Sequence, residues 1–250
     1  MNPPYRQIAR QLLPAPLYQQ VQPLYRSLRR FLTVVTRRLK GHSNTWWDMQ
    51  DPAYLRECFL RDPIDGINHP SRRYLRAWLQ AHPGLSLLDV PCGPGVEYEG
   101  FQRDQVSVRY IGMDASDVML TVCRRRFPGM DMRKGDITHI PLPDQAVDVV
   151  LCRHILEHLE DYRPAIREAV RVARQKVFLV LFRIPTHEER SALGRGAWDN
   201  RVNGRELTAF LESFGLSFTT TQLPYERPMP AGIEENVVVE VTIPENRAQP

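Results

Sequence analysis

Short apolar runs alternate along this chain with longer segments in which apolar residues recur every three or four positions. The first kind is typical of buried strands, and the second of helices with one buried face. The pattern predicts strands at 85–90, 108–113, 130–135, 147–152, 176–182, 216–223 and 236–243. Helices are expected near 96–104, 116–127, 162–173 and 204–214, and another in HPSRRYLRAWLQ, where Pro70 suits a first helical turn.

This order of elements predicts the fold class. Strands that alternate with helices form a mostly parallel sheet covered on both faces, so we expect a Rossmann-like, doubly wound α/β fold around seven strands. The last two strands have no helix between them, which predicts an antiparallel strand at one edge. A chain of 250 residues suits one such domain, expected over 46–250, after a helical extension over 1–45.

The extension holds the excess positive charge. Residues 17–40 have the apolar spacing of an amphipathic helix, and residues 1–40 contain seven Arg, one Lys and no acid, whereas the whole chain has a formal charge of +4. Such a helix can lie on an anionic membrane surface, or it can pack on its own domain with a solvated basic face. Because the rest of the chain is net acidic, a nucleic-acid partner is not expected.

The sequence also indicates a compartment. No stretch approaches the roughly 18 apolar residues of a membrane span, and the N-terminus lacks the apolar segment of a secretory signal. We therefore expect a cytoplasmic protein with at most peripheral membrane contact. The cysteines are widely spaced and are interpreted as reduced packing thiols rather than a zinc or redox pair; they are Cys58, Cys92, Cys123 and Cys152.

A glycine-rich turn follows the first predicted strand, in LLDVPCGPG. Gly93 and Gly95 allow a tight turn and a close approach to a ligand, and the helix from Val96 offers unpaired N–H groups. A dinucleotide fingerprint would need glycine where Tyr98 stands, and no phosphate loop ending in GK[ST] is present. The turn therefore predicts a ligand site that lacks both standard phosphate cradles.

Further acids follow the next strands. Asp114 ends the second strand in YIGMDAS, about 20 residues after the glycines, where an acid accepts hydrogen bonds from ribose hydroxyls. The alternative is that Asp114 caps the helix that begins near Ser116. Asp136 follows the third strand, and the string HILEH, from His154 to His158, follows the fourth.

Together, LLDVPCGPG, YIGMDAS and GDITHIPLPDQAVDVVLCRHILEHLED resemble the successive motifs of class I S-adenosylmethionine-dependent methyltransferases, particularly those with small-molecule acceptors. The resemblance spans roughly residues 85–182. It implies S-adenosylmethionine as cofactor and methyl transfer to a small-molecule, sugar-linked or lipid-linked acceptor. The cofactor-binding residues that it implies are Asp89, Pro91, Cys92, Gly93, Gly95, Asp114, Ala115, Asp136, Ile137 and Arg153.

The resemblance also implies roles for these residues. Asp89 and the two loop glycines would shape the pocket for the amino-acid part of the cofactor, and Asp114 would hold the ribose hydroxyls. Asp136 and Ile137 would bracket the adenine, while Arg153 and His154 would lie near the sulfonium end. Pro91 departs from the family, which usually has glycine there. Proline lacks an N–H and fixes φ, which keeps a non-catalytic binding module open as an alternative.

Two histidines are candidates for a general base. His154 comes first and His158 second, because a neutral imidazole can take a hydroxyl proton near working pH. The same string matches H-x-x-E-H, a zinc signature in which Glu157 would be the base of a hydrolase. That site would need a third ligand and a long helix, whereas HILEH directly follows a strand, so no metal is expected.

Two groups of residues could contact the acceptor. The upstream group, a candidate lid, consists of Trp46, Trp47, His69, Arg72 and Arg73, although helix caps, solvated charges and core aromatics are the more common roles. The second group lies in the long segment after the fifth strand, from which we expect acceptor specificity. It consists of Arg183, His187, Trp198, Asn200 and Arg201.

Overall fold

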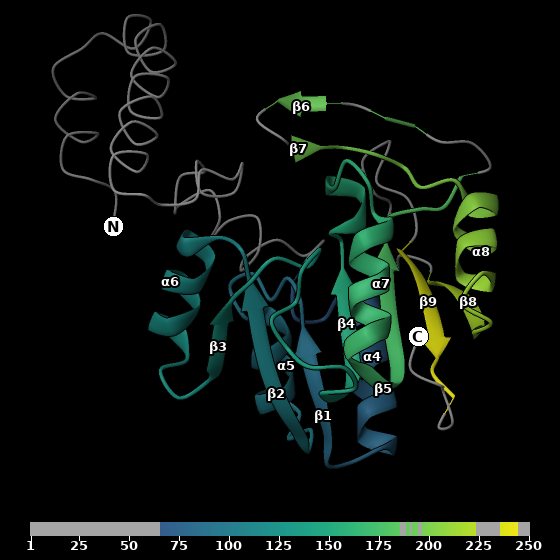
Figure 1. Ribbon diagram of the computed structural model, residues 1–250. Helices are drawn as coiled ribbons and strands as arrows, with labels where there is room; N and C mark the ends of the chain where they lie inside the picture. Colours follow the sequence, from purple (N-terminus) through teal and green to yellow (C-terminus); the bar gives the residue numbers. More distant parts are fainter. Residues whose placement is uncertain (1–65, 186–188, 191, 195–196, 224–235, 245–250) are drawn as a thin grey trace, which may run out of the picture. The chain divides into compact units, whose positions relative to one another are not determined.

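The computed structural model describes residues 66–185, 189–190, 192–194, 197–223 and 236–244 (Figure 1). The predicted extension over 1–45, its helix at 17–40, and Trp46, Trp47, Cys58 and His187 lie outside this part of the chain. Membrane contact through the helix therefore stays a prediction. Among the described helices, none combines the length and apolarity needed to cross a bilayer.

A seven-stranded sheet forms the centre of the fold, with strand order β3-β2-β1-β4-β5-β9-β8. The strands are β1 (Leu85–Asp89), β2 (Val108–Asp114), β3 (Asp131–Lys134), β4 (Val147–Arg153), β5 (Ala173–Leu181), β8 (Ser217–Leu223) and β9 (Asn236–Thr242). Strands β1 to β5 are mutually parallel, and β9 runs antiparallel between β5 and β8. The predicted fold class and its antiparallel edge are confirmed.

Helices cover both faces of the sheet (Figure 1). Helices α4 (Pro70–Ala81) and α5 (Val96–Arg103) share one apolar cluster with Leu87 and Phe178, whereas α7 (Arg163–Val172) and α8 (Gly204–Glu212) share the other. Helix α6 (Asp117–Arg126) packs beside β2 and β3. All seven residues of β4 are buried, as expected for a central strand that is covered on both faces.

Two local features differ from the expectations. Strand β5 begins at Ala173, three residues before the expected 176. Helix α7 ends at Val172, and the strand follows it without a turn. The segment after β5 contains a small hairpin, β6 (Ala192–Gly194) and β7 (Ala197–Trp198), which the hydrophobic pattern did not predict. Two strands this short have too few residues to show an alternating pattern.

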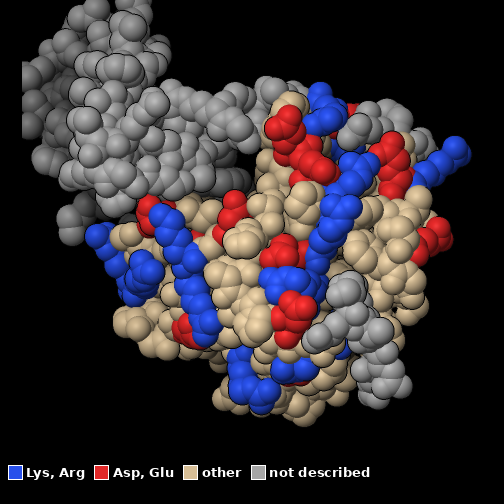
Figure 2. All heavy atoms as spheres, in the orientation of Figure 1, with Lys and Arg blue, Asp and Glu red and all other residues tan. Residues whose placement is uncertain are grey.

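Charges of both signs cover the face shown in Figure 2, where basic and acidic side chains lie next to one another. Ion pairs across the described surface include Lys134 with Asp117, and Arg163 with Glu206. The described residues of this face therefore do not form a continuous basic field.

Candidate functional site

The turn between β1 and α5 is held in a conformation that glycine favours. Gly93 and Gly95 have φ of +52° and +79°. A Cβ on Gly95 would lie 2.7 Å from the Sγ of Cys123 and 3.0 Å from the ring of Phe127, so this glycine is required by packing. A Cβ on Gly93 would meet no atom of the described residues within 4 Å. The backbone at Gly93 therefore borders open space, which suits close approach by a ligand.

Asp114 fixes this turn from the end of β2. One carboxylate oxygen accepts the N–H of Gly93 at 2.9 Å, and the other accepts the N–H of Ser116 at 2.8 Å. The helix-cap alternative for Asp114 is wrong, because the Ser116 hydroxyl caps α6 by accepting the N–H of Met119. Ala115 lies between these two anchor points and is half-buried. The structure thus brings the glycine turn and the acid of β2 together.

Pro91 does not detach the turn from the sheet. The peptide bond between Val90 and Pro91 is cis. On either side of it, Val90 donates its N–H to the carbonyl of Leu151 at 3.0 Å, and Cys92 donates to that of Met113 at 2.8 Å. The turn is therefore bonded to both neighbouring strands even though Pro91 has no N–H.

Buried charges lie beneath the turn. The Asp89 carboxylate, 1% exposed, accepts a hydrogen bond from the Tyr110 hydroxyl at 2.6 Å. Burial, together with the nearby Glu97 carboxylate, raises the pKa of Asp89 to about 8 although the hydrogen bond from Tyr110 opposes the change. Asp89 therefore belongs to the buried support of the turn.

Glu97 is the centre of this buried group. It accepts a hydrogen bond from Nη1 of Arg72 at 2.5 Å, and Nε of Arg153 lies 3.9 Å from the same oxygen. Nε of Arg153 also donates to the Ser71 hydroxyl at 3.3 Å. We name Asp89, Glu97, Arg72 and Arg153 the buried charge cluster. The sequence interpretation missed Glu97, whose only signal is an acid two positions after the last loop glycine.

The described residues expected in a lid make contacts within the fold, and the ring of His69 also lies 6.2 Å from that of His154, centroid to centroid. Arg72 is 5% exposed and is paired inside the buried charge cluster. His69 caps α4, since its side chain accepts the N–H of Ser71 at 3.2 Å. Arg73 is exposed on α4.

The first turn of α5 carries two acids, Glu97 and Glu99, and no side chain caps it. Glu99 pairs with Arg126 at 2.5 Å. Acids in a first turn occupy the positive end of the helix dipole and repel a phosphate. This helix start therefore suits a ligand without phosphate groups, in agreement with the missing phosphate motifs.

Asp136 and Ile137 lie just beyond the carboxyl end of β3, and the glycine turn lies just beyond the carboxyl end of β1, on the same side of the sheet. The Asp136 carboxylate is exposed and accepts the N–H and the hydroxyl of Thr138, each at 2.8 Å. The Ile137 side chain is buried. A polar and an apolar group are thus adjacent, as recognition of a purine ring would need.

His154 follows β4 at a φ of +49°. Its Nε2 lies 2.6 Å from the amide oxygen of Asn236, and its ring stacks on Phe182 with centroids 4.0 Å apart. Because an amide oxygen only accepts, Nε2 carries a proton, and in the neutral ring Nδ1 therefore carries the lone pair. His158 has the opposite arrangement, since its Nδ1 lies 2.9 Å from the carbonyl oxygen of Trp198.

The zinc alternative lacks its geometry. HILEH does not form a helix with both histidines on one face, because a single 3-10 turn, η3 (Leu156–His158), begins after His154. The two rings bond to different elements, β9 and β7. Within the described ranges, no group of three or more His, Cys, Asp or Glu could hold a metal ion.

Glu157 is a structural anchor instead of a zinc-assisted base. Its side chain is fully buried, and one carboxylate oxygen accepts the N–H of Phe182 at 2.7 Å. Its main-chain carbonyl accepts the N–H of Asn200 at 2.8 Å. Burial raises the pKa of Glu157, while His158 and the backbone donors oppose this. The anchor ties the end of β5 to the segment that follows the hairpin.

The described residues expected near an acceptor lie around this anchor. The Asn200 side chain donates to the Leu159 carbonyl at 2.7 Å, and Trp198 provides the carbonyl bound by His158. Arg201 pairs with Asp199 at 2.5 Å. Arg183 lies further along, on a cleft beside α8.

The sheet order, the glycine turn and the acid at the end of β2 define a Rossmann-like protein that binds a nucleoside cofactor without a phosphate cradle. Comparison with known proteins supports this class. Residues 88–181 match the family model described as a methyltransferase domain. Residues 88–181 therefore form a methyltransferase domain, and over this part the chain is similar to class I S-adenosylmethionine-dependent methyltransferases, whose cofactor is S-adenosylmethionine.

Individual relatives agree over part of their length. A protein of Mycolicibacterium smegmatis named as a probable S-adenosylmethionine-dependent methyltransferase is 34% identical over 144 residues, covering 55% of this chain and 54% of the relative. The malonyl-[acyl-carrier protein] O-methyltransferase of Yersinia pestis is 32% identical over 159 residues, covering 64% and 58%. The chain thus spans little more than half the length of these relatives.

A solved structure agrees in fold. The magnesium protoporphyrin IX methyltransferase of Synechocystis, determined with S-adenosylmethionine bound, has a TM-score of 0.53 at 16% identity. The match covers 87% of this chain and 96% of that one. At this identity, the likeness concerns the fold alone.

Proposed function

We propose that this protein transfers a methyl group from S-adenosylmethionine to a small-molecule, sugar-linked or lipid-linked acceptor. The observation that carries the proposal is the bond between Asp114 and Gly93, because it holds the acid at the end of β2 beside the backbone of the glycine turn. The acyl-carrier substrate in the name of the Yersinia pestis relative supports an acyl-type acceptor among these classes.

Each residue around the turn has a task in this proposal. A carboxylate oxygen accepts more than one hydrogen bond, so Asp114 can hold Gly93 and Ser116 and still accept from two ribose hydroxyls. Asp136 and Ile137 contact the adenine. The buried charge cluster keeps the turn in position from below.

The cofactor supplies a methyl group already activated on a sulfonium. The protein therefore has to align the acceptor and exclude water. Where the acceptor is a hydroxyl, the Nδ1 lone pair of His154 takes its proton, and Asn236 fixes the tautomer that leaves this lone pair in place. His158 is the second candidate, through Nε2.

Calorimetry with S-adenosylhomocysteine tests cofactor binding. We expect a micromolar dissociation constant for the wild type and a loss of at least about tenfold in Asp114→Ala, because hydrogen bonds to a charged group contribute about 1.5–3 kcal/mol. Asp117→Ala is the matched control, since this nearby acid pairs with Lys134 at the surface. Absence of binding heat in the wild type would contradict the proposal and favour a module that binds another partner.

Transfer itself is tested with S-adenosylmethionine that carries a labelled methyl group, offered with lipid and water-soluble extracts. We expect label in one of the two pools. His154→Gln should stop incorporation and leave S-adenosylhomocysteine binding unchanged. Incorporation at the wild-type rate in this variant would refute the role of His154 as the base.

A further inference from the structure

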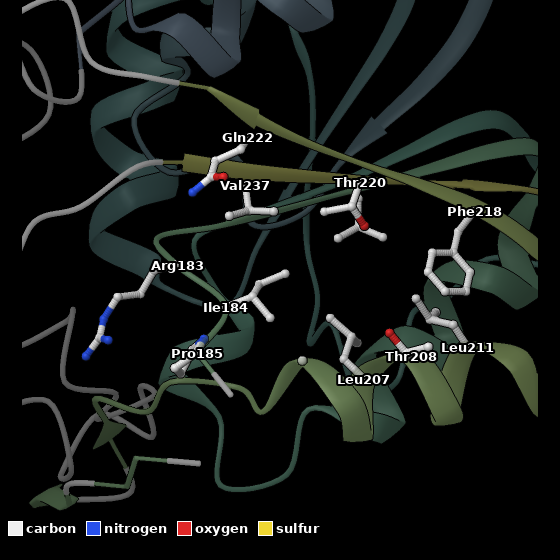
Figure 3. A pocket seen from close by; sticks show the side chains of 12 residues that line it. Arg183, Ile184, Pro185, Leu207, Thr208, Leu211, Phe218, Thr220, Gln222 and Val237 are labelled. Carbon is white, nitrogen blue, oxygen red and sulfur yellow. The ribbon is translucent and has the colours of Figure 1, made fainter. Parts of the chain in front are cut away.

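A cleft of about 460 Å³ lies between α8 and the edge strands β8 and β9. Its size is within the range of small-molecule sites. Arg183 and Gln222 lie at one end of the cleft, whereas Phe218 and Leu211 lie at the other (Figure 3). The cleft is therefore elongated, and one of its ends adjoins the carboxyl end of β5.

Most of the side chains that line the cleft are apolar. Helix α8 contributes Leu207 and Leu211, and β9 contributes Val237 and Val239, all of them buried side chains, while the uncharged polar residues are Thr208, Thr220 and Gln222. Of the described residues that line the cleft, Arg183 alone carries a charge. A mainly apolar cleft with one cation at its end matches a hydrocarbon chain that carries an anionic group.

Arg183 can bind such a group. Its side chain is 32% exposed, and its Nη2 atom donates a hydrogen bond to the Glu189 carboxylate at 2.5 Å. A guanidinium has five N–H donors, and an ion pair this exposed contributes little. A carboxylate or phosphate can therefore use the other donors or displace Glu189.

One end of the cleft also adjoins the proposed methyl-transfer site. Phe182, whose ring stacks on His154, immediately precedes Arg183. Two consecutive residues after β5 thus contact the two places, Phe182 at His154 and Arg183 at the cleft. A molecule that crosses this strand end can reach His154 with one part and fill the cleft with another.

We propose that the cleft between α8 and β8 binds the hydrocarbon part of the methyl acceptor, and that Arg183 pairs with an anionic group of that molecule. The assignment to the acceptor rests on the proposed methyl transfer. The recognised chemistry is an aliphatic chain with a carboxylate or a phosphate.

Calorimetry on the full chain tests this with hexanoate, octanoate, decanoate and decyl phosphate, each below its micelle concentration. Burying one methylene tightens binding by about fourfold, so each added pair of methylenes should tighten it by about fifteenfold until the cleft is full. Decyltrimethylammonium should bind much more weakly than either anion. Comparing decanoate with decyl phosphate shows which anionic group Arg183 prefers.

Two adjacent threonines on β8 provide a matched pair of variants. Thr220 lines the cleft beside Val239, whereas Thr219 pairs with Glu240 and points to the other face of the sheet. Thr220→Trp should abolish decanoate binding and Thr219→Trp should leave it unchanged. Arg183→Gln should weaken decanoate by up to about fivefold, as expected for a partly exposed ion pair, and leave decanol unaffected.

S-adenosylhomocysteine binding, measured on the same samples, separates the two proposals. A wild type that binds S-adenosylhomocysteine but shows no chain-length dependence, or equal decanoate binding in both threonine variants, overturns the cleft and leaves methyl transfer standing. A wild type that binds decanoate in the cleft but no S-adenosylhomocysteine overturns the methyltransferase proposal, and with it the assignment of the cleft to an acceptor.

Discussion

Adding one methyl group at Gly93 should separate cofactor binding from fold stability. A Cβ at this position meets no atom of the described residues within 4 Å, but it projects into the space proposed for the cofactor. Gly84 provides the control, because it also has a positive φ, +81°, and open space around its Cβ, yet it lies at the opposite end of β1. The two alanine variants differ mainly in their distance from the proposed site.

The stability cost follows from the backbone. An L-residue in the left-handed region costs about 1–2 kcal/mol, so Gly93→Ala and Gly84→Ala should lose similar free energies of unfolding. Gly95→Ala should lose more, since its Cβ would also lie 2.7 Å from Cys123 Sγ in a packed interior. Urea unfolding measures all three.

Binding should divide the variants differently. Gly93→Ala should weaken S-adenosylhomocysteine at least tenfold by calorimetry, whereas Gly84→Ala should bind it like the wild type. If Gly93→Ala binds as tightly as Gly84→Ala, the cofactor does not approach this backbone and the proposed site is wrong.

Three further predictions concern buried carboxylates. The folded-state pKa of Asp89, about 8, exceeds its usual value of 3.8. The contribution of Asp89 to stability is therefore full below about pH 4 and is lost as the pH rises to about 8. In urea unfolding, Asp89→Asn should remove this dependence of the unfolding free energy on pH, whose slope is at most about 1.4 kcal/mol per pH unit. For Glu157, the Gln variant should keep the bond from Phe182 N–H and cost less than about 1 kcal/mol, whereas Ala should cost about 3 kcal/mol or more; equal losses would mean that the charge is what matters. Burial disfavours the charged form of Asp148, but hydrogen bonds from Arg174 and its neighbours outweigh this effect and lower the pKa of Asp148 to about 2. The unfolding free energy of the wild type should therefore fall by up to about 2 kcal/mol as the pH falls from about 4 to about 2. Asp148→Asn should abolish this change without altering S-adenosylhomocysteine binding.

The sheet could be predicted from the sequence because its strands are almost continuous apolar runs. The run at 147–152 became β4, which is buried on both faces, and the absence of a helix before the last strand gave the antiparallel edge. The start of β5 was misplaced because Arg174 and Gln175, polar residues at its beginning, do not look like a buried strand.

The candidate site was only partly predictable. Turn glycines and an acid at a strand end leave local signals, so Gly93 and Asp114 were identified. The buried partners of Glu97 come from α4 and β4, and no local pattern shows that such distant residues meet. HILEH shows that a local pattern can also mislead. Its letters match a zinc motif, whereas the Glu157 carboxylate accepts a backbone N–H.

The pKa values of buried acids shift in opposite directions at the two ends of the sheet, and this difference supports the proposed position of the site. At the amino end, Asp148 is bonded by Ser86 and Arg174, and its pKa is lowered, so its charge stabilises the fold. At the carboxyl end, the pKa of Asp89 is raised, so ionising this carboxyl destabilises the fold. Buried ion pairs such as that of Glu97 are often no more stabilising than apolar packing. A costly cluster directly under the glycine turn is therefore better explained by the positioning of that turn than by stability, as is common at functional sites.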